Sequence, residues 1–361
     1  MKATITNIVI GLLLAACATA FSLVIFESCF RLYLLAQNWN RGSVESQLVR
    51  SEVNEPEELE GKTTLRGLVR ASPFEKIVYE LKPNLRGRFQ GTELRTNSFG
   101  MRDHEYEIVK APNTVRIIGL GDSVMFGWGV KEEETYLGRL EQSLNEESQG
   151  KQLFEVLNFA VPGYNTAMEV ATLEHRALPF HPDIIVIHFV KNDYDVPLFM
   201  REQINPLAFD RSFLLEFLQA RFGAGQKTGE LLNASLSSLP RSKRGKVLEQ
   251  YRDISGARGF KQAITRLGEL SQEKNIPVIL IVGNVSGKNR RRLEAVSSKF
   301  GFQLLDVRDH VRAYLKQNNL PDTKETRRKL FWVTPSDAHP SPLGHQLFAE
   351  ALLEKIETIL R

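Results

Sequence analysis

Five positions in the chain carry groups that together could carry out nucleophilic attack on an acyl group. Ser123 supplies a hydroxyl, His339 an imidazole that can act as its general base, and Asp337 a carboxylate that can orient the imidazole. Gly163 has no Cβ, so its backbone N–H can approach a ligand oxygen closely, and the amide of Asn192 can donate hydrogen bonds to an oxyanion. These residue types therefore indicate attack of a serine hydroxyl on a carbonyl carbon.

An alternation of strands and helices from Thr114 onward predicts the elements that would position these groups. Short runs rich in Val, Ile, Leu and Phe are typical of buried parallel strands, and helical stretches separate them. The predicted strands cover residues 115–120, 154–161, 183–190, 276–282 and 302–307, and the predicted helices cover residues 135–144, 166–178, 260–272, 289–300 and 343–360. This alternation favours a doubly wound α/β sheet.

The candidate groups lie close to the ends of these elements. Ser123 follows the first predicted strand, Gly163 the second and Asn192 the third, whereas His339 lies in a loop directly before the last helix, which Ser341 can cap. Ligands of doubly wound sheets bind outside the carboxyl ends of the strands. Each segment alone resembles an ordinary turn, but their joint occurrence at one sheet edge predicts a single site.

In these segments the sequence resembles the SGNH/GDSL hydrolase family. Ser123, Gly163, Asn192 and His339 match, one by one, the four residues that give the family its name. The resemblance covers roughly residues 114–361. It implies a flavodoxin-like three-layer α/β/α sandwich with a parallel sheet, serine chemistry that cleaves or transfers an acyl group, and no metal or cofactor.

The resemblance also implies a role for each residue. His339 takes the proton of Ser123 as the hydroxyl attacks an ester carbonyl. The backbone N–H groups of Ser123 and Gly163 and the side chain of Asn192 form the oxyanion hole. More loosely, residues 97–103 look like the segment that precedes the hydrolase domain in membrane-anchored bacterial members.

Two positions depart from the family pattern. The family usually has Gly two residues before the Asn, where this chain has Val190, and often has Asp three residues before the His, where it has Ser336. Asp337, two residues before His339, is therefore the predicted orienting acid.

Neighbouring residues allow other interpretations. His345 is an alternative base, but it is predicted to lie within the last helix. Asp122 and Asp193 adjoin the candidate residues and are expected to hold their loops in shape. Trp128 either lines a substrate cleft or packs in the core.

The composition excludes several classes of protein. The chain has 361 residues, of which 42% are hydrophobic and 25% charged, so wholly disordered and low-complexity proteins are excluded. Cys17 and Cys29 are its two cysteines, which rules out a disulfide framework and a zinc site built on cysteine. The net charge of +4 is too small to argue for nucleic acid, which is not an expected partner.

The N-terminus predicts a membrane segment. Residues 8–26 are 19 uncharged residues that would form a helix of roughly 28 Å, about one hydrocarbon core. Lys2 precedes this run, which favours an N-terminus inside and a body on the periplasmic or extracellular face. Alternatively, Cys17 follows a Leu-Ala-Ala sequence like a bacterial lipobox and could be lipidated.

The predicted organisation has four parts. Residues 1–26 form the transmembrane anchor or signal segment, residues 27–75 a stalk, residues 76–113 an accessory lead-in of strands and turns, and residues 114–361 the hydrolase domain. Residues 196–255 interrupt the alternation of strands and helices and are predicted to be an insertion, partly helical around residues 212–222.

Three functions of different class fit the sequence. The first is a membrane-tethered serine esterase acting on an acyl ester, for example one carried by an envelope glycan or lipid. The second is an O-acyltransferase that uses the same serine to modify an exported polysaccharide. The third is a non-catalytic binding protein on this fold.

Overall fold

The computed structural model describes residues 2–40, 58–59, 62–199, 251–283 and 287–361, together with residues 212, 214, 215 and 285. Most of the predicted insertion and residues 41–57 of the predicted stalk lie outside the described residues. The chain divides into two compact units, one of Met1–Asn54 with Arg201–Glu230 and one of Glu55–Met200 with Leu231–Arg361.

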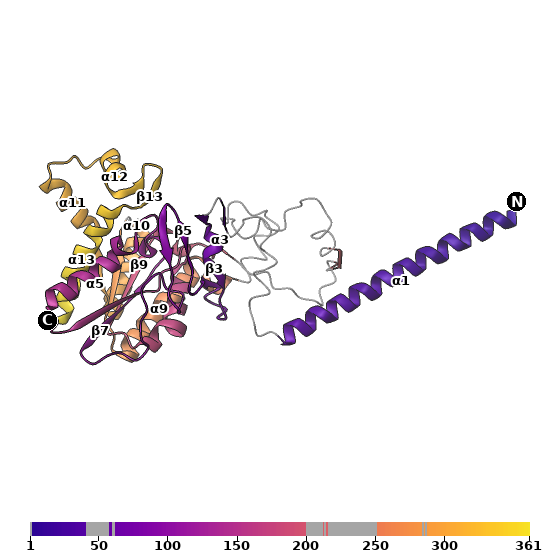
Figure 1. The fold of residues 1–361 in the computed structure, drawn as a ribbon, viewed down its shortest axis with the longest axis horizontal. Helices are drawn as coiled ribbons and strands as arrows, with labels where there is room; N and C mark the ends of the chain where they lie inside the picture. Colours follow the sequence, from indigo (N-terminus) through magenta and orange to yellow (C-terminus); the bar gives the residue numbers. More distant parts are fainter. Residues whose placement is uncertain are drawn as a thin grey trace. The chain divides into compact units, whose positions relative to one another are not determined.

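A five-stranded parallel sheet forms the centre of the second unit (Figure 1). Its strands lie in the order β11-β10-β9-β7-β8, which is the flavodoxin-like order. All side chains of β7, β9 and β10 are buried, as expected for strands covered on both faces. The strands are β7 (Thr114–Leu120), β8 (Leu153–Asn158), β9 (Ile184–Phe189), β10 (Val278–Val282) and β11 (Gln303–Asp306).

Helices cover both faces of this sheet and complete three layers. The chain steps from β7 to β8 through α5 and returns past β7 to β9 through α6, so right-handed crossovers place α5 and α6 on opposite faces. Helix α13 packs beside α5, α9 packs against α6, and α10 packs against α9 (Figure 1). These helices are α5 (Tyr136–Ser148), α6 (Thr166–Thr172), α9 (Gly256–Lys274), α10 (Gly287–Phe300) and α13 (Pro342–Leu360). The predicted α/β/α fold is confirmed.

The segment before the sheet folds into short antiparallel pairs within the same unit. Its side chains join the main core, among them Ile77, Tyr79, Phe89 and Met101, each at most 3% exposed. The elements are β1 (Glu58–Leu59) paired with β2 (Lys62–Thr63), α3 (Leu65–Leu68), β3 (Val69–Ala71) paired with β4 (Tyr79–Leu81), and β5 (Arg86–Phe89) paired with β6 (Thr92–Arg95).

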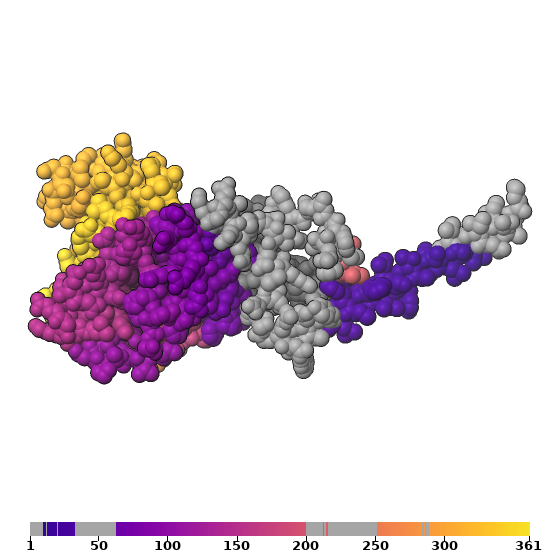
Figure 2. Space-filling model, in the orientation of Figure 1, coloured from indigo at the N-terminus to yellow at the C-terminus, as the bar shows by residue number. Residues whose placement is uncertain are grey.

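Between β11 and α13 the chain forms an excursion that sequence analysis did not predict. It consists of α11 (Arg308–Gln317), α12 (Lys324–Phe331) and the antiparallel pair of β12 (Trp332–Thr334) and β13 (Asp337–Pro340). The expectation that His339 lies in a loop was therefore wrong, because residues 337–340 pair with β12. A second, small apolar cluster around Val311, Leu315, Phe331 and Leu347 supports the excursion, which projects from this unit (Figure 2).

Helix α1 (Lys2–Asn40) belongs to the other unit. Residues Leu13–Leu32 are long and apolar enough to cross a membrane, and none of this stretch is buried against the rest of the protein. Within it, Glu27 and Arg31 form an ion pair at 2.7 Å. Length and composition suit a membrane anchor or a signal sequence.

Candidate active site

Ser123 lies at the first position of α4 (Ser123–Phe126), a single turn that follows β7 directly. Asp122 caps this turn by accepting a hydrogen bond from the backbone N–H of Val124 at 2.9 Å. Gly121 allows the chain to turn so tightly, because a Cβ there would lie 2.7 Å from the Cβ of Met125. Ser123 therefore lies at the carboxyl edge of the sheet, and the residue is half-buried.

A continuous row of hydrogen bonds joins Ser123, His339 and Asp337. His339 Nε2 lies 2.8 Å from Ser123 Oγ, and His339 Nδ1 lies 2.6 Å from Asp337 Oδ1. The hairpin holds Asp337 in place, because its backbone N–H donates to Thr334 Oγ1 at 3.1 Å. A serine, an imidazole and a carboxylate in this order can activate the hydroxyl and stabilise the imidazolium that results.

The environment keeps the carboxyl of Asp337 ionised. Burial acts to raise its pKa, but hydrogen bonds from the backbone N–H and ring of His339 and from the indole of Trp128 outweigh this, so the pKa is lowered overall. An ionised acid beside Nδ1 holds the imidazole with its proton on that nitrogen, which leaves Nε2 free to accept the proton of Ser123.

Trp128 contacts this row directly, which sequence analysis did not predict. Its Nε1 donates to Asp337 Oδ2 at 3.0 Å. Its ring stacks on the imidazole of His339, with centroids 4.8 Å apart and planes 15° from parallel. The partners are separated by 209 positions in the sequence, so no local pattern could have indicated the pairing.

Asn192 joins the group through Asp122. It lies in the single turn Lys191–Tyr194 after β9, and its Nδ2 donates to Asp122 Oδ2 at 3.0 Å. The same oxygen lies 3.5 Å from Ser123 Oγ. Asp193 closes the turn by accepting from the backbone N–H of Val190 at 2.9 Å. The two aspartates hold these loops, as expected.

Gly163 lies in the loop after β8, which packs on the loop after β7. The backbone N–H of Val161 donates to the carbonyl of Gly121 at 3.1 Å. Gly163 has a φ of +79°, and a Cβ there would lie 2.8 Å from the Cβ of Leu198 and 2.9 Å from the hydroxyl of Tyr79. Glycine is therefore required both by the backbone conformation and by its neighbours. The Val161–Gly121 contact joins the two loops that carry Gly163 and Ser123.

Buried carboxyl groups lie beneath the site. Burial raises the pKa values of Glu169, Asp193 and Asp122. Repulsion from Asp193 raises the pKa of Glu169 further, and repulsion from Asp122 does the same for Asp193. Both carboxyl oxygens of Glu169 are buried without a hydrogen-bond partner. Retention of protons here avoids several adjacent negative charges in a medium of low polarity.

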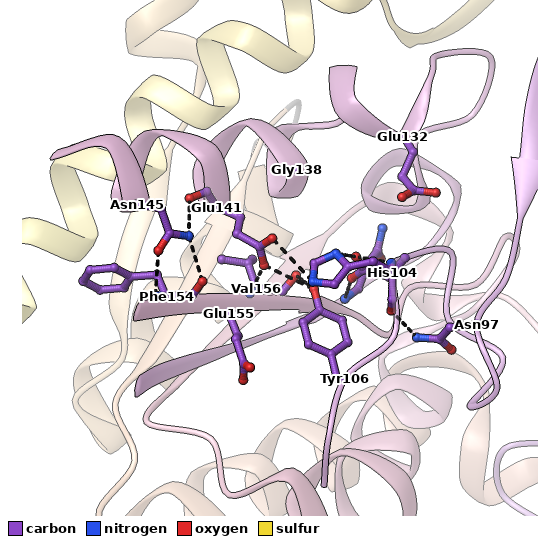
Figure 3. Close-up of polar contacts among 12 residues, drawn as sticks. Asn97, His104, Tyr106, Glu132, Gly138, Glu141, Asn145, Phe154, Glu155 and Val156 are labelled. Carbon is purple, nitrogen blue, oxygen red and sulfur yellow. Dashed lines mark hydrogen bonds and ion pairs between the residues drawn. The ribbon is translucent and has the colours of Figure 1, made fainter. Parts of the chain in front are cut away.

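A separate polar cavity of about 300 Å³ lies where the lead-in segment meets α5 and β8. His104 and Glu141 point toward one another at its wall, with Nε2 and Oε1 3.7 Å apart (Figure 3). Burial raises the pKa of Glu141 to about 7, and the hydrogen bond that the His104 ring donates to the Asp103 carboxylate raises the pKa of His104. Ser123 does not line this cavity.

Among the described residues, no group of three or more His, Cys, Asp or Glu is arranged to hold a metal ion.

Comparisons with known proteins place the chain in a family. A model described as the GDSL-like Lipase/Acylhydrolase family matches residues 120–347, which is well over half of the chain. A comparison with the curated proteins finds no match.

Solved structures of esterases are also similar to this chain. The acetyl xylan esterase AlAXEase is 18% identical, with 67% of this chain and 100% of that chain covered and a TM-score of 0.39. Axe2, an acetylxylan esterase from Geobacillus stearothermophilus, is 16% identical over 69% of this chain and 96% of its own, with a TM-score of 0.39. The psychrotrophic esterase EstA from Pseudoalteromonas sp. is 14% identical over 69% of this chain and 98% of its own, with a TM-score of 0.37. Similarities this distant add nothing to the assignment, which rests on the family match. The chain belongs to the GDSL-like lipase and acylhydrolase family of ester-hydrolysing enzymes.

Proposed function

We propose that this enzyme cleaves acyl esters with Ser123 as nucleophile, His339 as general base and Asp337 as the acid that orients the base. The observation that carries the proposal is the uninterrupted row of contacts from Ser123 Oγ to His339 Nε2 and from His339 Nδ1 to Asp337. Both distances lie within the range in which a proton can transfer between nucleophile and base.

The reaction proceeds in two halves. Ser123 Oγ bonds to the ester carbonyl carbon as its proton passes to His339 Nε2, and the carbonyl oxygen becomes an oxyanion. His339 then returns the proton to the departing alcohol, which leaves an acyl group on Ser123. Water attacks this acyl-enzyme with His339 again as base, and the free acid departs.

The oxyanion is stabilised by the backbone N–H groups of Ser123 and Gly163 and by the side chain of Asn192. The amide nitrogen of Asn192 carries two hydrogens. Asp122 accepts one of them, which fixes the orientation of the amide and leaves the other for the substrate. Donors fixed before the reaction stabilise the transition state without reorganising during it.

The substrate is an acyl ester on the outer side of a membrane, carried by a glycan or lipid, and α1 tethers the enzyme there. Support for the tether comes from the apolar side chains that α1 leaves exposed, including Leu14 and Phe21 at 65% and 68%. Lys2 precedes the apolar run, which favours an N-terminus on the cytoplasmic side.

Replacement of the serine tests the proposal. Ser123→Ala should abolish turnover of p-nitrophenyl acetate and labelling by a fluorophosphonate, while circular dichroism and thermal melting stay unchanged. Ser336→Ala is the matched control, because Ser336 is an exposed serine in the same region, and it should keep its rate within about twofold. Retention of more than about a tenth of the activity by Ser123→Ala would overturn the serine mechanism.

A further inference from the structure

The loop that carries Trp128 is held by an arginine from outside the region matched by the family model. Arg102 donates through Nη1 to the carbonyls of Phe126 and Gly127 at 3.0 and 2.5 Å. Its Nη2 donates to the carbonyl of Val130 at 2.6 Å. The side chain is 2% exposed, and burial lowers its pKa to about 10, which still leaves it charged at neutral pH. One guanidinium thus fixes the backbone on both sides of Trp128.

Two further contacts fix the indole and its loop. Phe89 of β5 packs edge-on against the Trp128 ring, with centroids 4.9 Å apart and planes 82° apart. On the other side the loop lies directly on β12, because a Cβ at Gly129 would lie 2.8 Å from Val333 Cγ1. The loop is therefore packed between the lead-in segment and the hairpin that carries Asp337.

We propose that Trp128 is a positioning residue for the Asp337–His339 pair, and that Arg102 and Phe89 of the lead-in segment act by holding Trp128 in place. The inference rests on the proposed function. It makes residues before the family-matched region necessary for full activity.

The contacts of Asp337 show how the Trp128 indole positions the Asp337–His339 pair. Asp337 Oδ1 accepts from both the backbone N–H and the ring of His339, and Oδ2 accepts from Trp128. The indole N–H therefore prevents the carboxylate from rotating away from the imidazole. The ring face that stacks on His339 also favours the imidazolium that forms when Ser123 attacks, since aromatic faces attract cations.

Substitutions in the full-length protein in detergent test this inference. We would measure kcat and KM for p-nitrophenyl acetate and the rate of fluorophosphonate labelling, each per active site. Trp128→Phe keeps an aromatic ring and removes the donor, so kcat and the labelling rate should fall roughly 10- to 100-fold, the equivalent of a lost hydrogen bond to a charged group. KM should change by less than about twofold, because ground-state binding is not altered.

Matched controls separate positioning from a general effect on the fold. Trp332→Phe makes the same change on β12, where the ring lies under Arg328, and it should leave the rates within about twofold. Arg139→Lys serves the same purpose for arginine, since Arg139 donates to the carbonyl of Glu134.

A double-mutant cycle tests the role of Arg102. Lysine cannot reproduce the planar fork that reaches three carbonyls, so Arg102→Lys should lower kcat by a similar factor. If Arg102 acts through Trp128, the kcat of the variant with both Arg102→Lys and Trp128→Phe should lie within about threefold of the kcat of the slower single variant. Should Arg102→Lys not fold, Phe89→Leu takes its place in the cycle.

The possible results distinguish a failure of the positioning role from a failure of the proposed function. Wild-type kcat in Trp128→Phe, with Ser123→Ala inactive, would overturn the positioning role and leave the serine mechanism intact. If the fold-decreases in kcat of the two single variants multiply in the double variant, Arg102 does not act through Trp128. Full activity in Ser123→Ala would overturn the proposed function and this inference together.

Discussion

The imidazole of His345 accepts a hydrogen bond through Nδ1 from the backbone N–H of Tyr136 at 3.2 Å. This contact ties α13 to the first residue of α5, and the His345 side chain is fully buried. Burial, followed by the nearby positive charge of Arg102, lowers the pKa of His345 to about 3. A neutral, buried imidazole that accepts from a helix N-terminus has a structural role.

The two histidines should therefore respond differently to substitution. His339→Ala should lower kcat by several orders of magnitude with little change in melting temperature, because it removes the base and leaves the core intact. His345→Ala should keep its kcat per folded molecule but lose about 1–3 kcal/mol of stability, since the Tyr136 N–H loses its partner. Kinetics and denaturant unfolding on the same samples check both, and the reverse pattern would identify His345 as the base.

Asn192 gives a second prediction about the site. If its free amide hydrogen binds the oxyanion, Asn192→Ala should lower kcat by ~10²–10³ while KM changes little. Asn318→Ala is the control, because Asn318 is exposed at the C-terminal end of α11 and its side-chain amide donates to the carbonyl of Tyr314. An Asn192→Ala enzyme with the wild-type kcat would exclude the side chain from the oxyanion hole.

The stability of the fold should depend on pH through His188. This side chain is buried in β9, its Nδ1 lies 3.0 Å from the hydroxyl of Tyr136, and burial lowers its pKa to about 4. The folded pKa lies below the unfolded value of about 6.5, so between these values the unfolded chain binds one more proton. Stabilisation from a neutral His188 is therefore present above pH 6.5 and is lost as the pH falls.

A comparison with His188→Gln separates the contribution of His188 to the pH dependence of stability from that of the carboxyl groups whose pKa values are raised. The free energy of unfolding of the wild type should fall relative to the variant by about 1.4 kcal/mol per pH unit between roughly pH 6.5 and pH 4. Urea unfolding at several pH values measures this difference. Parallel pH dependences in the two proteins would show that His188 does not titrate as its burial requires.

The sheet could be predicted from the sequence because its strands are short runs in which apolar residues predominate or, in β10, occupy every position. The run predicted at residues 115–120 became β7 (Thr114–Leu120), and the run at 276–282 became β10 (Val278–Val282). Burial on both faces requires apolar side chains at consecutive positions, and this pattern is visible locally.

The hairpin that carries the acid and the base could not be predicted in this way. Strands β12 and β13 are three and four residues long, and β13 contains Asp, Ala, His and Pro, which do not form an apolar strand pattern. Helices α11 and α12 are rich in charged residues and bury few side chains. Both helices pack against α13, and local sequence patterns do not show such packing. The contact of Trp128 with Asp337 depends on the same packing.

Helix α1 should anchor the protein in a membrane. If Leu13–Leu32 is an uncleaved anchor, the full-length protein should remain in the membrane fraction after an alkaline carbonate wash and should keep its own N-terminus. The Glu27–Arg31 ion pair lies near the C-terminal end of this stretch, where charged side chains can reach the interface at low cost. A chain that starts near residue 62 should be soluble and should keep its esterase activity, because the catalytic residues and the lead-in segment lie within it.

Two measurements separate the alternatives. Lipoprotein processing would remove the first 16 residues and leave an acylated Cys17 as the new N-terminus, which mass spectrometry of the N-terminal peptide detects. Protease added to spheroplasts should degrade the body if it faces outward, as Lys2 on the N-terminal side of the apolar run favours. A body that stays protected in intact spheroplasts but is degraded after lysis would place the enzyme on the cytoplasmic side and contradict the proposed orientation.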